Sequence, residues 1–214
     1  MFESIGQADL QSLSNKAIEK NFKKGDIIFK EGDSNIFVYI ISDGQVKSAK
    51  YTADGKEAIT EILGKCDVMG QVVILGKASY DYSASALTDT SALLIKRDDF
   101  LAVIKKNSEL ALKLIESLSS RLKETQNKLQ EFVSEKVEQR IAKALLMLKG
   151  RMGDEIPFTR QEIANMVGTT IETAIRVTSR FKEAKIIDSV RGKIMILNEQ
   201  KLKVMAEGMP IKFR

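Results

Sequence analysis

Residues 159–177 read TRQEIANMVGTTIETAIRV, and this stretch decides how the C-terminal part of the chain folds. Thr159 and Glu162 have the spacing of a capping box, in which each side chain bonds the other residue's backbone amide at a helix start. The glycine in the middle of the stretch predicts the end of that helix. Thr169 and Glu172 then predict a second capping box. The stretch therefore predicts two short helices joined by a glycine turn, a helix-turn-helix.

A hairpin is predicted directly after the second helix. Residues 186–190 and 194–197 are mostly apolar, and Arg191-Gly192-Lys193 between them has the composition of a turn. Two strands that follow a helix-turn-helix in this way form a wing. The C-terminal part is therefore predicted to be a winged helix-turn-helix, the motif whose second helix enters the DNA major groove.

The second helix has an inner and an outer side. Ala174, Val177 and Phe181 recur at helical spacing and are expected to face inward. The opposite side, near the N-terminal end that approaches bases, carries four polar residues, Thr170, Glu172, Thr173 and Arg176.

Glu172 and Arg176 lie one helical turn apart, and each suits one base. Arginine donates to O6 and N7 of guanine, and glutamate accepts from N4 of cytosine, so the pair can read both strands at neighbouring base pairs. The other interpretation is an ordinary ion pair between residues i and i+4, and the two roles are compatible.

Several further residues are candidates for phosphate contact. Backbone amides and hydroxyls at a helix N-terminus suit an anion, and a cation in the wing adds attraction. The candidates are Thr159, Arg160, Gln161, Thr170 and Lys193. The same residues could serve only in capping and solubility.

The positive charge of the chain is concentrated in this region. Residues 134–214 carry 16 Lys and Arg against 10 Asp and Glu, whereas residues 1–133 carry 18 against 19. A basic segment attached to a neutral one is the electrostatic footprint of nucleic-acid binding, since neutralised phosphates release counterions. A solvated basic face is the alternative.

Upstream, residues 108–134 predict one long helix. Apolar side chains and one threonine recur there at alternating steps of three and four, at Ile115, Leu118, Leu122, Thr125, Leu129 and Phe132. This is the a/d seam of a coiled coil, and its natural cover is a second copy of the helix. We therefore expect a homodimer, although the stripe could instead pack only against its own N-terminal domain.

The N-terminal part predicts a β-structure. Residues 22–97 contain short apolar runs separated by turns rich in Gly and Asp, a pattern typical of an antiparallel sandwich or barrel. The predicted fold class is α+β, with a β-barrel domain over residues 1–107, a dimerisation helix over 108–134 and a winged helix-turn-helix DNA-binding domain over 135–214.

Composition excludes several classes of function. The 214 residues are 43% hydrophobic, as in globular chains, and no apolar run is long enough to span a membrane, so a soluble cytoplasmic protein is expected. Cys66 is the only cysteine and histidine is absent. No internal disulfide is possible, no metal site is predicted, and enzyme chemistry is disfavoured because the usual general base is missing.

These motifs, in this order, resemble the Crp/Fnr family of bacterial transcription regulators over nearly the whole chain. GDIIFKEGD at 25–33 and DGQV at 43–46 look like turns of the family's cyclic-nucleotide-binding jelly roll. FTRQEIA at 158–164 and Glu172-Thr173 followed by Arg176 resemble its DNA-reading motif. Ile171, directly before Glu172, resembles the apolar residue that the Fnr branch has at this position. Ile175 stands where that branch has serine. The resemblance implies a dimer on palindromic double-stranded DNA, a shared G-A core in the half-site, and RNA polymerase as a partner.

The effector end departs from that pattern. In the family's cyclic-nucleotide binders a Gly-Glu pair opens the phosphate-binding cassette, and an Arg-Ser/Thr-Ala run closes it. Here the matching stretches are Gly70-Gln71-Val72 and Tyr82-Ser83-Ala84. Tyr82 cannot supply the positive charge of the arginine, so cyclic AMP is not expected to bind in the usual manner.

Two residues of the long helix complete the candidate effector site. They are Arg121 and Thr125, of which Thr125 aligns with the family position that touches adenine and is equally suited to marking the register of a coiled coil. The effector and any cofactor stay unassigned; haem without histidine, a redox role of Cys66, and DNA binding without effector all stay open. The competing class is a cyclic-nucleotide-binding module that acts through protein contacts.

Overall fold

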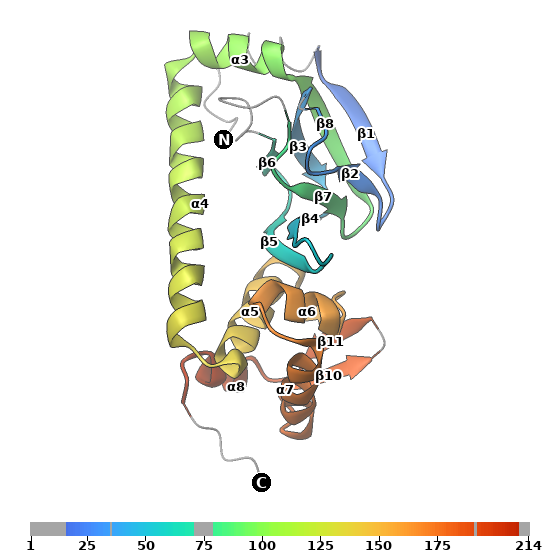
Figure 1. Ribbon diagram of the computed structural model, residues 1–214, viewed down its shortest axis with the longest axis vertical. Helices are drawn as coiled ribbons and strands as arrows, with labels where there is room; N and C mark the ends of the chain where they lie inside the picture. The colour runs from blue at the N-terminus through green and yellow to red at the C-terminus, as the bar shows by residue number, and fades with distance from the viewer. Residues whose placement is uncertain (1–15, 35, 71–78, 191, 210–214) are drawn as a thin grey trace. The chain divides into compact units, whose positions relative to one another are not determined.

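The computed structural model describes residues 16–34, 36–70, 79–190 and 192–209 (Figure 1). The chain divides into two compact units, the first formed by residues 1–51 and 59–123 and the second by 52–58 and 124–214. The sequence also predicts a short helix at the start of the chain, and that stretch lies outside the described residues.

The first unit contains two four-stranded antiparallel sheets, as the spacing of apolar runs and turns predicts. Their orders are β1-β8-β3-β6 and β2-β7-β4-β5. The strands are β1 (Ile18–Phe22), β2 (Ile27–Phe29), β3 (Phe37–Asp43), β4 (Val46–Tyr51), β5 (Glu57–Leu63), β6 (Val68–Met69), β7 (Ser83–Ala86) and β8 (Thr90–Lys96). The short strand β1 was not predicted.

The core of this unit is shared by both sheets. Buried residues of β1 to β8 form one cluster, among them Phe29, Ile41, Met69 and Ala84. The turn between β3 and β4 requires glycine at position 44, where φ is +84° and an added Cβ would stand 2.4 Å from the carbonyl oxygen of residue 89. This turn carries the chain from β3 of one sheet to β4 of the other.

Helices follow the sheets. The helix α3 (Arg97–Lys106) was not predicted, and its Phe100 and Val103 join a second buried cluster. Asn107 separates α3 from the next helix. Its side-chain oxygen accepts from the Leu110 amide at 3.0 Å and so caps that helix. That helix, α4 (Ser108–Ser134), has the predicted bounds, and only its first turns carry buried residues.

The second unit contains the predicted winged helix-turn-helix. Its elements are α5 (Val137–Met152), β9 (Glu155–Ile156), α6 (Arg160–Val167), α7 (Ile171–Glu183), β10 (Ile187–Val190), β11 (Lys193–Ile196) and α8 (Glu199–Ala206). The strands pair in the order β10-β11-β9, so the wing has a third strand that was not predicted. The short helix α8 was also missed.

Two predicted helix starts were wrong by a residue or two. The sequence predicts an amphipathic helix over 135–149, but the amide of Glu135 still bonds back to Glu131 in α4, so α5 begins at Val137. The amide of Thr169 bonds to the Ala164 carbonyl and completes the end of α6. The first residue available to cap α7 is therefore Thr170, and not Thr169.

Candidate DNA-reading surface and effector pocket

The helix-turn-helix is held by side-chain caps at both helix starts. The Glu162 amide donates to Thr159 Oγ1 at 3.2 Å and the Thr159 amide donates to Glu162 Oε2 at 2.8 Å, so the first capping box is confirmed. Gly168 closes α6 with φ of +61°, and the Thr173 amide donates to Thr170 Oγ1 at 3.3 Å. These contacts fix the N-terminal end of α7.

The two sides of α7 separate as predicted. Ala174, Val177 and Phe181 are buried, together with Thr178. Glu172, Ile175 and Arg176 are exposed and lie at positions i, i+3 and i+4 of one face. The outer face of α7 therefore carries one anion, one cation and one apolar side chain.

Glu172 and Arg176 are not paired with each other. No ion pair links the two within the described part of the chain. The helix amide of Glu172 and the Thr170 side chain lower the pKa of the Glu172 carboxyl, which keeps it an ionised acceptor at neutral pH. The Glu172 carboxylate therefore has part of its acceptor capacity taken up by the start of α7, and its remaining acceptor positions face outward with Arg176.

The candidate phosphate contacts differ in how they are held. Arg160 donates from Nη2 to Ser189 Oγ of the wing at 2.8 Å, Gln161 donates to Asn165 at 2.8 Å, and Lys193 pairs with Glu155 of β9. These residues come together around the N-terminus of α6 and the wing. Exposed ion pairs contribute little, so phosphate can displace such a partner.

The C-terminal turn of α4 packs on the helix-turn-helix within the second unit. A Cβ added to Gly168 would stand 2.5 Å from Cε1 of Phe132, so the ring lies directly on the glycine. The Arg140 guanidinium lies over the same ring, 5.1 Å from its centroid, and donates to the carbonyl oxygens of Val167 at 3.2 Å and Glu135 at 2.8 Å. The end of the long helix is thereby joined to the turn that precedes α7.

A second contact strengthens this junction. Lys143 of α5 donates to Glu131 at 3.0 Å and pairs with Glu135. Burial disfavours the charge of Lys143, but the hydrogen bonds to the two carboxylates outweigh it and raise the pKa of this lysine. Sequence reasoning did not find this cluster, because Glu131 and Glu135 precede Lys143 by 12 and 8 positions and are brought to it only by the fold.

At the effector end, the structure brings Gly70, Tyr82 and Arg121 together. The buried Gly70 amide donates to the Tyr82 hydroxyl at 3.0 Å. Arg121 donates from Nη2 to the Val68 carbonyl at 3.0 Å and pairs through Nε with Glu61 at 3.3 Å. Burial raises the pKa of Tyr82 to about 12, so its phenol is neutral. Glu61 was not predicted; its pairing with Arg121 depends on the fold.

The other candidate effector residues do not join this group. Ser83 accepts from the Glu31 amide at 3.0 Å, and its side chain points away from the core. Ala84 is buried in the core, and Thr125 is exposed on α4. Gln71 and Val72 lie outside the described residues.

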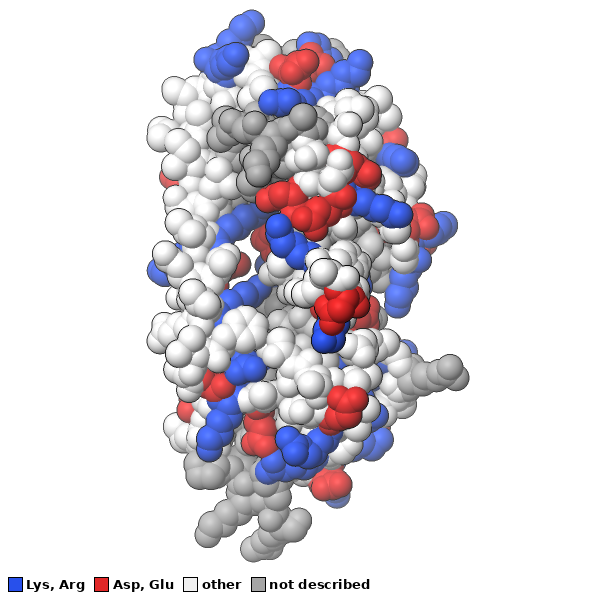
Figure 2. Space-filling model, viewed as in Figure 1, with Lys and Arg blue, Asp and Glu red and all other residues white. Residues whose placement is uncertain are grey.

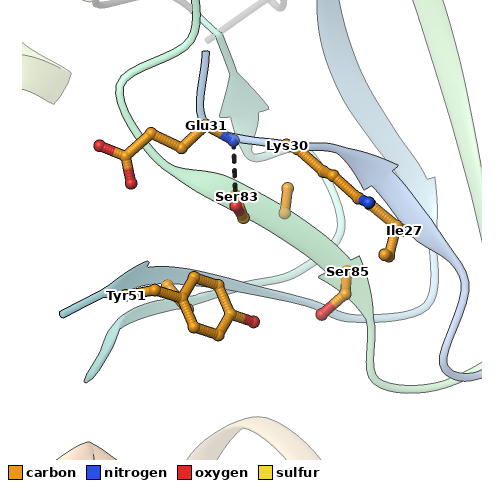
Figure 3. Close-up of a pocket in the computed structure, with 8 residues that line it drawn as sticks. Ile27, Lys30, Glu31, Tyr51, Ser83 and Ser85 are labelled. Carbon is orange, nitrogen blue, oxygen red and sulfur yellow. Dashed lines mark hydrogen bonds between the residues drawn. The ribbon is translucent and has the colours of Figure 1, made fainter. Parts of the chain in front are cut away.

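An open cleft of about 480 Å³ lies on the face of the sheet opposite the core (Figure 3). Figure 3 shows Tyr51, Ser85 and Ile27 around it, with the Ser83 hydroxyl turned to the Glu31 backbone. Ser83 and Ser85 line it because they alternate along β7 with the core residues Ala84 and Ala86. Five lining residues belong to stretches that carry the family resemblance: Ile27, Lys30 and Glu31 in residues 25–33, and Ser83 and Ala84 in the run that closes the cassette.

The described residues carry neither a cluster of metal ligands nor a membrane-spanning helix. Among the described residues, no group of three or more potential metal ligands is close enough to hold an ion. No helix in the described ranges combines the length and apolarity needed to cross a membrane. Figure 2 shows Lys and Arg interspersed with Asp and Glu on the face viewed, without one uninterrupted basic patch.

Comparisons with known proteins match both halves of the chain. Residues 19–107 match the model of the cyclic nucleotide-binding domain, and residues 139–205 match that of the Crp-like helix-turn-helix domain. A CRP-like cAMP-activated global transcriptional regulator of Mycobacterium tuberculosis is 28% identical over 207 residues, which cover 93% of this chain and 92% of the relative.

Two further relatives agree. The fumarate and nitrate reduction regulatory protein of Vibrio cholerae is 29% identical over 95% of this chain and 84% of its own. The solved structure of FixK2 from Bradyrhizobium japonicum superposes with a TM-score of 0.77 at 25% identity, covering 88% of this chain and 96% of that one. With both domain models and full-length relatives in agreement, the chain belongs to the Crp/Fnr family of DNA-binding transcription regulators.

Proposed function

We propose that the protein binds a palindromic DNA site as a homodimer, with the outer face of α7 in the major groove of each half-site. The observation that carries this proposal is that face itself, on which Glu172 and Arg176 are exposed, one turn apart and not paired with each other. Arg176 reads guanine and Glu172 accepts from cytosine N4. Half-sites one helical turn, about 34 Å, apart fit such a dimer.

The remaining candidate residues position the protein on the DNA backbone. Thr159, Arg160, Gln161, Thr170 and Lys193 surround the N-termini of the two helices and the wing, where phosphate contacts are expected. Thr173 joins these candidates at the start of α7, where its Oγ1 accepts from the Thr170 hydroxyl at 3.2 Å. Residues 1–107 are the effector-sensing part, 108–134 dimerise and 135–214 bind DNA.

Replacing Arg176 by alanine tests the reading of bases. We expect Arg176→Ala to lower affinity for the specific duplex by about 5-fold to 150-fold per half-site, since one bidentate guanine contact is lost in each. Lys201→Ala, which removes an equal charge from an exposed position on α8, is the matched control. Fluorescence anisotropy at fixed salt measures both. Unchanged specific binding by the Arg176 variant would point instead to a module whose basic domain contacts protein.

We further infer that the regulator does not bind cyclic AMP in the usual manner. Tyr82 is neutral, and its hydroxyl already accepts the Gly70 amide at the opening of the cassette. Arg121 is engaged by Glu61 and the Val68 carbonyl. The effector is another ligand, or the dimer binds DNA without one.

Signals pass, in this proposal, through the end of α4. Phe132 and Arg140 join α4 to the turn before α7. A shift of α4 in the dimer therefore changes the distance between the two α7 helices. RNA polymerase is the expected downstream partner, and the cytoplasm is the expected location. Catalytic activity is no part of the proposed function.

A further inference from the structure

One apolar side chain lies on the reading face of α7 between the two charged ones. Ile175 is 40% exposed, and it adjoins Arg176 and stands one turn after Glu172. Its neighbours Ala174 and Val177 fill the buried side of the helix, so Ile175 has no room in the core. It is therefore presented outward at the place where bases are read.

The backbone that carries Ile175 is firmly held. Thr178 is buried, and its hydroxyl donates to the carbonyl oxygens of Ala174 at 2.8 Å and Ile175 at 3.1 Å. The Thr170 cap fixes the first turn of the same helix. Because isoleucine is branched at Cβ, few rotamers are open to it in a helix. Its methyl groups thus have a defined position on the face.

The major groove offers such a side chain one specific partner. Among the four bases only thymine presents an apolar group there, its 5-methyl, and apolar side chains recognise it by contact. Facing cytosine, the isoleucine would cover an amino group without replacing its hydrogen bond to water. Arg176 and Glu172 supply the hydrogen-bonding contacts on either side.

We propose that Ile175 is a specificity-determining residue that contacts the 5-methyl group of one thymine in each half-site, next to the base pair that Arg176 reads. This role rests on the proposed function, because it requires α7 in the major groove. It assigns an outer base of the half-site that the charged pair leaves unspecified. Isolated exposed apolar residues are common on protein surfaces, so the test must remove one methyl group and nothing else.

Deoxyuridine provides that test, because it pairs like thymidine and lacks only the methyl. A duplex is first selected by the purified wild-type protein from a randomised palindrome. Each thymine of the half-site is then replaced in turn by deoxyuridine, symmetrically in both halves, and affinity is measured by anisotropy at fixed salt. We expect one sensitive position, where affinity falls about fourfold per half-site, or roughly 15-fold for both.

Variants connect the methyl group to the side chain. Ile175→Ser should bind the thymidine and deoxyuridine duplexes equally, and Ile175→Val should keep a reduced difference. Leu197→Ser removes an apolar side chain that is 58% exposed and lies outside α7, and this variant should discriminate like wild type. In the converse test, 5-methylcytosine at the sensitive position should bind the wild type more tightly than cytosine.

The outcomes separate this inference from the proposed function. If the wild type selects a site but no deoxyuridine changes its affinity by more than twofold, Ile175 does not contact a methyl group. Equal discrimination by Ile175→Ser would also overturn the inference, since another residue would then sense the methyl. Failure of the wild type to select any sequence would overturn the proposed function itself.

Discussion

Position 82 holds a tyrosine where cyclic-nucleotide binders of the family have an arginine, and the exchange changes the chemistry of the cassette. The phenol accepts a hydrogen bond from the buried Gly70 amide and packs edge-on against Phe29, with ring centroids 5.3 Å apart. A neutral acceptor thus replaces a cation. A phosphate entering here would lose its charged partner and would have to displace the tyrosine from the glycine amide.

Tyr82→Phe measures what this hydrogen bond contributes. The variant leaves the buried Gly70 amide without its acceptor, so the free energy of unfolding should fall by about 1 to 3 kcal/mol in chemical denaturation. Tyr51→Phe, at a position 52% exposed, is the control and should change it less. Equal stability of wild type and Tyr82→Phe would show that the contact is not made.

The raised pKa of Tyr82 also predicts an alkaline effect. Burial raises it to about 12 in the folded state, above the ordinary value of 10. A raised folded pKa contributes stability below pH 10 that is lost as pH rises from 10 to 12, because the unfolded state then ionises first. Wild type should therefore lose stability more steeply than Tyr82→Phe across this window. If the free energy of unfolding of the two proteins fell equally between pH 10 and 12, the prediction would be wrong.

Among the elements, the turn between α6 and α7 depends most on a single residue. Gly168 combines a left-handed backbone with a phenyl ring where its Cβ would lie. Gly168→Ala should lower the free energy of unfolding through both effects. In a Phe132→Ala background Gly168→Ala keeps the backbone strain but no longer meets the ring. There it should lower the free energy of unfolding by about 1 kcal/mol less than in the wild type. A double-mutant cycle by denaturation measures this; strict additivity would mean that ring and glycine do not touch.

The outer stripe of α4 tests the dimer. Leu122 and Leu129 are 61% and 65% exposed in the single chain, which leaves the predicted seam available to a second copy. Leu122→Glu should sediment as a monomer in analytical ultracentrifugation at micromolar concentration, because two carboxylates would meet in the seam. Leu112→Glu, on a residue 60% exposed but off the seam, should stay dimeric. Monomeric wild type, or a dimeric Leu122→Glu, would contradict the seam.

At the scale of the whole molecule, local signals predicted the elements well. Capping residues, glycine turns and the heptad spacing predicted α4, α6, α7 and the wing, because each is determined by neighbours in sequence. The prediction of Thr169 as the cap of α7 was wrong. The Thr169 amide bonds to the Ala164 carbonyl at the end of α6, a contact that depends on backbone geometry and leaves no mark in the sequence. Short elements such as β1 and α8 have too few residues for a clear period.

The sites were predictable where one element carries them. Glu172 and Arg176 share one helix face, so periodicity placed them together. Arg121 meets Glu61 only after the sheet and α4 have packed, and spacing in the sequence carries no sign of that pairing. Ser83 was placed with the effector site by resemblance, yet strand alternation turns its side chain to the other face.

The most direct test of the account is fluorescence anisotropy of the purified protein on the selected palindromic duplex, at one stated salt concentration, with and without cyclic AMP. We predict tight, sequence-specific binding that cyclic AMP leaves unchanged within twofold. Binding that appears only when cyclic AMP is added would show that Tyr82 does not prevent nucleotide recognition. Absence of any preference for the selected duplex over a scrambled one would contradict the reading face on α7.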